Sequence, residues 1–428
     1  MFRRIVKAFI PKRLFRKIEP FGHLCEAVFF NLIYGFPARK FKIIGITGTN
    51  GKTTTAFLVQ KMLHEAGYKV GLMTTVAFGV GDKLTIPEDH YTNVPVPLMM
   101  KRLRQMRANG AEWLVMEVTS IALAQNRLWG MPFYLAAMTN ISQDHLDYHG
   151  DMDHYIEAKL KLFRRANHNK NGMRTGVINA DDATAERFSG VIKNSLTYGI
   201  DKGQLKAKDI KLGASGSSYK AVIAEAEYDI SCQLPGRFNV YNSLAAVAVG
   251  RSLNLSQKQI EQGIASVKGV LGRMTAVEAG QSFSVLVDFA HTPDALENVL
   301  KAANELTRGK VILVFGATGD RDKSKRPVMG KVAVKNADLI YLTDDETYTE
   351  DPAQIISQVY KGVEQAGGED HTKIVEDRLD AIKLAFAAAK PGDTVLLTGM
   401  GHETTRNMGG KQVDWNEIEI AQELLKTR

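Results

Sequence analysis

One short segment carries the clearest chemical signal in the sequence. An apolar run over residues 42–47 predicts a buried strand, and a glycine-containing turn follows it. The turn and the residues that open the next helix are Gly48, Thr49, Asn50, Gly51, Lys52, Thr53 and Thr54. Glycines let the backbone approach phosphate oxygens, the first N–H groups of a helix bind them, and a lysine neutralises their charge. The segment therefore predicts a phosphate-binding loop, although Ile46 stands where the strict pattern has glycine.

Three more residues have side chains suited to phosphate or metal chemistry. Glu117 lies at the end of a predicted strand over residues 113–118, where the ligand-binding residues of α/β folds gather. His145 lies in a polar segment, and Lys159 lies on a predicted helix over residues 152–165. Taken alone, these residues have simpler explanations, namely a solvated carboxylate, a packed or capping histidine and a solvent-facing lysine.

Apolar runs alternate with helical patterns along most of the chain, which predicts parallel sheets covered by helices. The first series has strands at 42–47, 70–76, 113–118, 135–139 and 175–179, then helix-free strands within 203–233 and helices at 239–253 and 256–267. The second series has strands at 284–288, 311–315, 339–343, 373–375 and 394–398. We predict an α/β fold: a P-loop, doubly wound ATPase domain at 41–270, then a smaller Rossmann-like domain at 271–428.

Composition limits the class of protein. The 428 residues are too many for one ordinary core, and 44% hydrophobic with 24% charged residues excludes collagen-like or disordered chains. Cys25 and Cys232 are too far apart for a disulfide framework, and Cys and His show no zinc-site spacing. No apolar run reaches the ~18 residues of a membrane-spanning helix, and no small-residue cleavage site marks an export signal. These features predict a reducing, cytoplasmic location and no nucleic-acid partner.

Residues 1–40 differ from the rest and predict a basic, amphipathic helical segment. Its first twenty residues hold the cations Arg3, Arg4, Lys7, Lys12, Arg13, Arg16 and Lys17 against the single acid Glu19. Apolar residues recur at helical spacing over 2–10, Pro11 breaks the pattern, and a second short helix is expected over 24–33. Packing on the ATPase domain is the favoured role. Contact with an anionic membrane and contact with a substrate diphosphate are the alternatives.

The phosphate loop and several later segments together resemble the Mur ligase family, which includes the folylpolyglutamate synthases. The similarity covers about 41–428, and its further segments are 116–120, 139–150, 155–159, 234–242, 272–274, 287–294, 316–323 and 401–403. Within the family, the chain is most similar to UDP-N-acetylmuramoyl-tripeptide synthetases of the MurE type. The resemblance implies an ATP- and Mg²⁺-dependent ligase of peptidoglycan precursor synthesis. Such an enzyme joins a muramoyl-peptide carboxylate to an amino acid through an acyl phosphate.

The resemblance also implies roles for individual residues. Lys52, Glu117, His145 and Lys159 would be catalytic, with Thr53, Glu117, His145 and a carbamylated Lys159 serving Mg²⁺. The nucleotide would contact the phosphate loop and Asn242, Arg273, Asp288 and His291. The substrates would contact Thr92, Ser120, Gln125, Arg127, Asp344, Asp345 and Glu403.

Two departures from the family pattern bear on the substrates. Only about forty residues precede the ATPase domain, so the uridine-nucleotide domain of about one hundred residues is expected to be missing. The stretch 343–352 lacks the arginine that binds the second carboxylate of diaminopimelate. Asp344, Asp345 and Glu346 lie there instead, as a pocket for a cationic amine or as a solvated acidic loop. The alternatives to the tripeptide ligase are a folylpolyglutamate-type ligase, a ligase with a lipid-linked substrate, and a non-catalytic ATP-binding scaffold.

Overall fold

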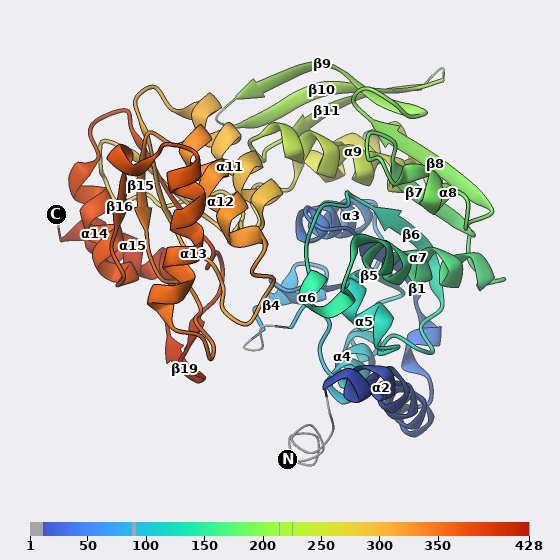
Figure 1. The fold of residues 1–428 in the computed structure, drawn as a ribbon. Helices are drawn as coiled ribbons and strands as arrows, with labels where there is room; N and C mark the ends of the chain where they lie inside the picture. The colour runs from blue at the N-terminus through green and yellow to red at the C-terminus, as the bar shows by residue number, and fades with distance from the viewer. Residues whose placement is uncertain (1–11, 88–90, 214, 225, 428) are drawn as a thin grey trace.

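Two sheets in sequence organise the chain (Figure 1). The structure is a computed structural model that describes residues 12–87, 91–213, 215–224 and 226–427. Between residues 42 and 232, the described strands form one eleven-stranded sheet, and six strands between 275 and 398 form the second. This architecture confirms the predicted fold class of a P-loop-type α/β domain followed by a smaller α/β domain.

The first sheet is parallel in its middle and antiparallel at both edges. Its order is β11-β10-β9-β8-β7-β6-β1-β5-β2-β3-β4. The strands are β1 (Lys42–Thr47), β2 (Val70–Met73), β3 (Phe78–Val80), β4 (Lys83–Thr85), β5 (Trp113–Glu117), β6 (Phe133–Met138), β7 (Thr175–Asn179), β8 (Asn194–Gly199), β9 (Leu205–Gly213), β10 (Gly216–Ile223) and β11 (Ala226–Cys232). The first strand of the chain, β1, therefore lies inside the sheet between β5 and β6. Such a reversal of strand order opens a crevice at the carboxyl ends of the strands.

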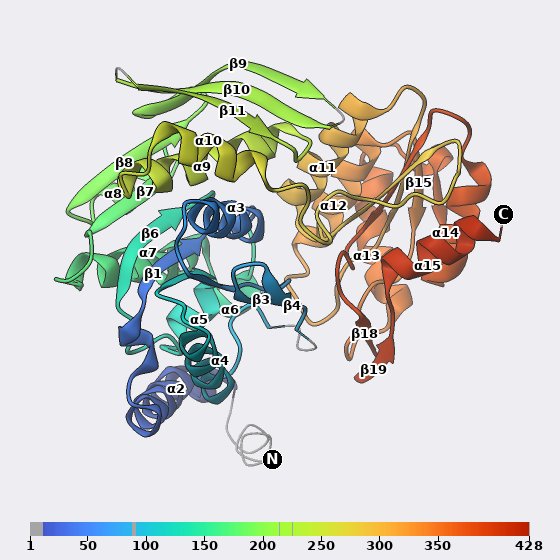
Figure 2. The same ribbon diagram turned by 180° about the vertical axis from the view of Figure 1, so that it is seen from behind.

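Helices cover both faces of this sheet. One face carries α3 (Lys52–Glu65), α9 (Arg237–Ser252) and α10 (Gln257–Ala265), over which β9–β11 curve (Figure 2). The other carries α2 (Lys12–Tyr34), α4 (Val96–Ala108), α5 (Ser120–Ala124), α7 (Met152–His168) and α8 (Ala185–Ser189). Alternate residues of β1 face opposite cores: Ile44 and Ile46 pack with α3, whereas Ile43 packs on the other side. Both faces are buried, which explains why β1 is an unbroken apolar run.

The second sheet has the order β12-β13-β17-β14-β15-β16, with only β12 antiparallel. Its strands are β12 (Thr275–Ala276), β13 (Ser284–Asp288), β14 (Val311–Phe315), β15 (Leu339–Leu342), β16 (Thr372–Ile374) and β17 (Thr394–Thr398). The helices on one face are α11 (Pro293–Leu306), α12 (Lys325–Asn336) and α13 (Pro352–Gln365), and those on the other are α14 (Arg378–Ala388) and α15 (Glu417–Lys426). A separate hairpin, β18 (Thr405–Met408) and β19 (Lys411–Asp414), lies beside the loop that follows β15.

The strands expected in the sequence are present, several with the same bounds. The strands that the sequence did not predict are β3, β4, β8, β12, β18 and β19. Most of these are only three or four residues long, and their polar residues leave no periodic pattern to detect. The expected helix over 24–33 is part of a longer helix, α2, which runs through Pro20. The apolar stripe predicted over residues 2–10 lies outside the described residues. No helix in the described ranges is long and apolar enough to cross a membrane.

Candidate active site

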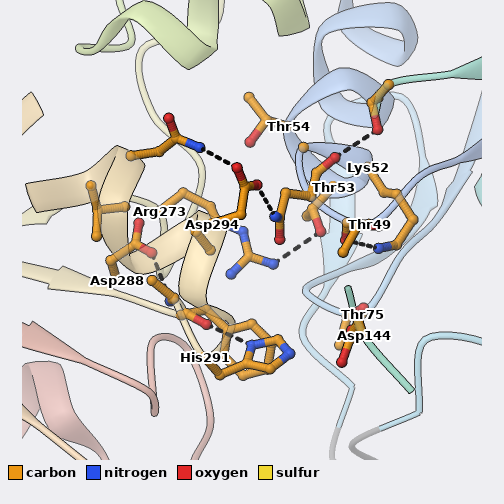
Figure 3. Close-up of a pocket in the computed structure, with 18 of the residues that line it drawn as sticks. Thr49, Lys52, Thr53, Thr54, Thr75, Asp144, Arg273, Asp288, His291 and Asp294 are labelled. Carbon is orange, nitrogen blue, oxygen red and sulfur yellow. Dashed lines mark hydrogen bonds between the residues drawn. The ribbon is translucent and has the colours of Figure 1, made fainter. Parts of the chain in front are cut away.

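A cavity of about 530 Å³ lies between the two domains. Its walls include the loops after β1, β5 and β6 on one side and residues that follow β13, β14 and β15 on the other. Figure 3 shows side chains from both domains facing each other across it, with Lys52 and Thr53 opposite Arg273 and Asp294. The cavity therefore lies at the carboxyl ends of parallel strands in both sheets, where α/β folds bind ligands.

The phosphate loop is held in shape by residues that follow β6. Thr49 N donates to Asn140 O at 2.7 Å, and Asn50 N donates to the Asn140 side chain at 2.9 Å. Thr139 Oγ1 donates to Asn50 O at 2.6 Å. Gly48 lies at φ 151° and Gly51 at φ 79°, and a Cβ on Gly48 would overlap the Thr139 hydroxyl. Glycine is therefore required at Gly48 by conformation and by space.

Lys52 begins α3 and turns back over the loop. Its Nζ donates to Thr49 O at 2.7 Å and to Gly48 O at 3.1 Å. Burial lowers the pKa of Lys52, while the nearby carboxylates of Glu117 and Asp144 oppose that effect. The ammonium lies at the cavity wall, within a partly desolvated environment where a charge acts more strongly than it does in water.

Lys159 is buried, contrary to what its helix alone suggests. Its side chain is 2% exposed, its Nζ donates to Gly48 O at 2.6 Å, and it lies 4.5 Å from the Tyr155 ring centre. Burial, with a contribution from Lys52, holds the pKa of Lys159 well below its ordinary value. The structure thus brings this lysine from α7 under the phosphate loop, although it does not line the cavity.

Asp144 is a charged residue of the site that the sequence analysis missed. It is 6% exposed, and one oxygen lies 3.4 Å from His145 Nε2. Burial alone would raise the pKa of Asp144, but the neighbouring basic groups, namely His145 when protonated, Lys325 and Lys52, outweigh burial and hold it below its ordinary value. Burial lowers the pKa of His145. Asp144 directly precedes His145, so its position beside a candidate residue was the available signal.

The donors around Thr53 suit a hard cation. Glu117 ends β5 with 1% exposure, and its Oε1 accepts a bond from Thr75 N at 3.1 Å. No group of three or more His, Cys, Asp and Glu side chains within the described ranges is arranged to hold a metal by itself. A buried carboxylate and a threonine hydroxyl nevertheless fit Mg²⁺, which prefers oxygen and usually keeps waters or phosphate oxygens as its other ligands.

The second domain forms hydrogen bonds with two residues of the phosphate loop, Thr53 and Asn50. Arg273 Nη2 donates to Thr53 Oγ1 at 3.1 Å, and Asn50 Nδ2 donates to Asp294 Oδ2 at 2.6 Å. Asp288 accepts bonds from the backbone N–H groups of Met274, which follows Arg273, and of Ala290, each at 2.8 Å. Asp288 therefore shapes the turn that presents Arg273.

His291 and Asn242, which were also predicted to bind the nucleotide, line the same cavity. Burial lowers the pKa of His291 to about 3, so this imidazole is neutral near pH 7. Asn242 projects from α9, donates to Asn239 Oδ1 at 2.9 Å and lies close to Gly51.

The residues predicted to hold a muramoyl-peptide fall into two groups. Thr92 lines the cavity, and its hydroxyl lies 2.7 Å from that of Thr75. Ser120, Gln125 and Arg127 are not among its lining residues. Ser120 instead contacts His149 Nε2 at 3.0 Å, and Arg127 Nη1 donates to Asn93 O at 2.6 Å.

One end of the cavity is acidic. Asp345, Glu346 and Glu403 line it and are each less than 10% exposed. Burial, reinforced by Glu403 and Asp345, raises the pKa of Glu346 to about 7. Asp344 is not a lining residue and pairs with Arg406 at 2.8 Å, so the acidic stretch splits between the cavity and a structural ion pair.

Two residues missed in the sequence, Arg321 and Tyr348, complete this end of the cavity. The Tyr348 hydroxyl donates to Glu346 Oε2 at 3.2 Å, and Arg321 lies over the Tyr348 ring at 4.8 Å. Both residues belong to segments that the sequence analysis singled out, 316–323 and 343–352. Only the contact between those two loops shows that Arg321 and Tyr348 belong to the cavity.

Comparison with protein families accounts for this arrangement. Residues 46–250 match the Mur ligase middle domain, and residues 272–401 match the Mur ligase glutamate ligase domain. The chain belongs to the Mur ligase family. The predictions of an ATP-dependent acid–amino-acid ligase and of amide bond formation in peptidoglycan precursor synthesis are therefore confirmed.

Individual Mur ligases agree with this membership. A UDP-N-acetylmuramoyl-L-alanyl-D-glutamate–2,6-diaminopimelate ligase of Caldanaerobacter subterraneus is 40% identical over 395 residues, covering 92% of this chain and 80% of that protein. One from Clostridium acetobutylicum is 38% identical, covering 99% and 86%. A solved structure of such a ligase has a TM-score of 0.61 at 30% identity, covering 90% and 78%. A Mycobacterium tuberculosis folylpolyglutamate synthase has a TM-score of 0.70 at 18% identity, covering 88% and 92%, which shows a shared fold alone.

We expect Lys52→Ala to lose most ATP-dependent activity, because it removes a buried charge at the phosphate loop. Such losses are commonly of order 10²-fold or more. The matched control is Lys61→Ala on the same helix, where Lys61 pairs with Glu65 and Asp82 outside the cavity. Steady-state ADP release together with thermal unfolding tests the pair. A folded Lys52→Ala protein that turns over as fast as Lys61→Ala would contradict the role of the loop.

Proposed function

We propose that this Mur ligase is of the MurE type and adds an amino acid to a muramoyl-dipeptide carboxylate. The observation that carries the proposal is a single cavity with a phosphate loop at one end and a cluster of carboxylates at the other. One end suits ATP and the other suits the amine of an incoming amino acid. Relatives that are 38–40% identical are named as ligases of this class, whereas the likeness to a folylpolyglutamate synthase extends only to the fold.

The reaction proceeds in two steps. A carboxylate oxygen of the muramoyl-peptide attacks the γ-phosphorus of ATP, which forms an acyl phosphate and releases ADP. The amino group then attacks the acyl carbon, the carbon–oxygen bond to phosphate breaks, and the amine gives up a proton as the amide forms. All the phosphorylated species are anionic, so both steps are favoured by Lys52, Arg273 and the N–H groups of the phosphate loop.

Mg²⁺ would be held by Thr53 and Glu117, which both line the cavity, and the resemblance adds His145 and a carbamylated Lys159. When bound, Mg²⁺ neutralises phosphate charge and orients the phosphoryl group. Independently of the metal, Asp144 holds the His145 ring at 3.4 Å. Lys52 and Arg273 meet the phosphates from opposite domains.

Lys159 is proposed to act as a carbamate. A lysine amine must be neutral to react with CO₂, and burial already lowers the pKa of Lys159 well below its ordinary value. The neutral amine and CO₂ form a nitrogen–carbon bond and release one proton, so a neutral amine becomes a carbamate anion. Beside Lys52 and the phosphate loop, that anion would be stabilised by the surrounding positive charge.

The nucleotide is proposed to bind across the domain junction. Asn242 offers a donor and an acceptor for the adenine edge, and Arg273 suits phosphate. Asp288 presents Arg273 through the turn that it stabilises, and His291 lies nearby as a neutral imidazole. Because the site has two halves, relative movement of the domains is expected to open and close it.

The muramoyl-peptide is proposed to approach along Thr92, with Ser120, Gln125 and Arg127 behind it as a second layer. The carrier of this peptide is either a soluble uridine diphosphate or a lipid. If the carrier is a lipid, residues 1–40 would contact the membrane surface.

The amino acid is proposed to have a cationic side chain and one carboxylate. Asp345, Glu346 and Glu403 offer negative charge for an ammonium, and Arg321 offers one guanidinium for a carboxylate. The relatives are named for diaminopimelate, which carries a second carboxylate. A second carboxylate near three buried acids would be repelled.

An amino-acid screen tests the proposed reaction. With ATP and UDP-muramoyl-dipeptide, we expect ADP release and a tripeptide product to depend on lysine or ornithine, with diaminopimelate a poor substrate. Mass spectrometry of the product is the readout. Exclusive use of diaminopimelate would refute the amino-acid choice, and absence of product with every amino acid would refute the soluble carrier.

A pH series tests the acidic end of the cavity. Because the pKa of Glu346 is about 7, its carboxylate ionises as pH rises from 6 to 8, and the KM for lysine should fall. The ionised fraction grows up to about tenfold over this range, which bounds the effect. Glu346→Gln should raise the KM for lysine and abolish that dependence, while the KM for ATP stays constant. An unchanged lysine profile in Glu346→Gln would exclude Glu346 from amine binding.

The carbamate proposal predicts that Lys159→Ala is inactive and is partly rescued by formate or acetate, which replace the missing anion. Lys161→Ala, two residues along α7 and outside the cavity, should remain active without rescue. ¹³C NMR of protein in ¹³C-bicarbonate is a second readout, with one carbamate signal lost in Lys159→Ala. A wild-type protein without that signal would contradict the modification.

A further inference from the structure

Helix α2 carries an apolar stripe that nothing in the described structure covers. Ile18, Phe21, Phe29 and Leu32 are 46%, 67%, 57% and 63% exposed, and Ile33 beside them is 58% exposed. Ile18, Phe21, Cys25, Phe29 and Leu32 recur at intervals of three or four residues, so they share one side of the helix. Twelve large apolar side chains are exposed among the described residues, and α2 carries five of them, Ile18, Phe21, Phe29, Leu32 and Ile33. A concentration of this kind marks a contact surface.

The opposite side of α2 fixes the helix to the first domain. His23, Ala27 and Asn31 are buried there, and Asn31 Nδ2 donates to Trp129 O at 3.1 Å. The packing of α2 therefore uses a different face and leaves the stripe facing outward. Figure 1 shows α2 at the edge of the molecule, on the far side of the first domain from the second. An exposed position of this kind is open to a large flat partner.

We propose that this stripe docks the enzyme on an anionic lipid bilayer. Residues 1–17 carry seven lysines and arginines and no acid, and the stripe begins at the next residue, Ile18. Apolar side chains that enter the acyl boundary next to cations that meet anionic headgroups are the two components of an interfacial helix. A second copy of the chain would bring another set of cations to the same place, with no acidic residue on the stripe to oppose them.

None of the stripe residues lines the cavity between the two domains. The inference assigns the membrane contact considered above to particular residues of α2. It rests on the proposed function only for the reason why docking would be useful, because binding to lipid does not require catalysis.

Co-sedimentation with vesicles tests the surface. The full chain should bind vesicles of phosphatidylglycerol and phosphatidylcholine at low salt and should not bind pure phosphatidylcholine. The triple variant Phe21→Ser, Phe29→Ser, Leu32→Ser should lose at least tenfold in affinity. Its matched control changes Val328, Ile374 and Leu384 to serine, which are similarly exposed apolar residues of the second domain. That control should bind like wild type.

Two further measurements distinguish loss of lipid binding from misfolding and from a change in oligomeric state. The triple variant should keep the wild-type thermal midpoint and the wild-type rate of ADP release with soluble substrates, since its residues are outside the cavity. Size-exclusion chromatography with light scattering should show no change in mass between wild type and variant. Equal vesicle binding by wild type and the triple variant would overturn the proposal. So would a wild-type dimer that the variant breaks, because the stripe would then be an interface between copies.

Discussion

The contact between the phosphate loop and the second domain is the constraint on which the rest of the site depends. Asn50 bonds Asp294 and Thr53 bonds Arg273, so two residues of the loop are held by the second domain. Neither domain alone encloses the cavity, and the acidic end belongs entirely to the second domain. A reaction between a phosphorylated carboxylate and an amine needs both ends of the cavity at once. The junction between the domains therefore sets the distance and orientation of the two reacting groups.

Charge in this junction is concentrated by burial. Lys52 and Lys159 both reach Gly48 O, and burial lowers the pKa of each. Asp144 stays anionic because the surrounding cations outweigh the effect of its own burial. At the other end, Glu346 has an acidic neighbourhood and a pKa near 7. The cavity is thus polarised, with Lys52 and Arg273 at the phosphate loop and a cluster of acids at the other end.

The sequence predicted the parts of this structure that depend on local patterns. Strands β1, β7, β13, β14 and β17 have the predicted bounds because each is a short apolar run buried on both faces. It could not predict the parts that depend on distant contacts. Lys159 looks like a solvent lysine until α7 packs beneath the loop, and Asp344 differs from Asp345 only because Arg406, sixty-two residues later, pairs with it. For residues 1–40 the sequence left packing, membrane contact and substrate contact open for the same reason, since the outer stripe of α2 is defined by what fails to pack on it.

The central claim is that this junction activates a carboxylate by phosphorylation. It is tested most directly by an isotope transfer experiment. The enzyme would turn over muramoyl-dipeptide labelled with ¹⁸O in the reacting carboxylate, together with unlabelled ATP and lysine, and the released phosphate would be analysed by mass spectrometry. An acyl phosphate intermediate predicts one ¹⁸O atom from the carboxylate in each phosphate released. Phosphate without substrate-derived ¹⁸O, formed at the same rate as the amide, would contradict this account.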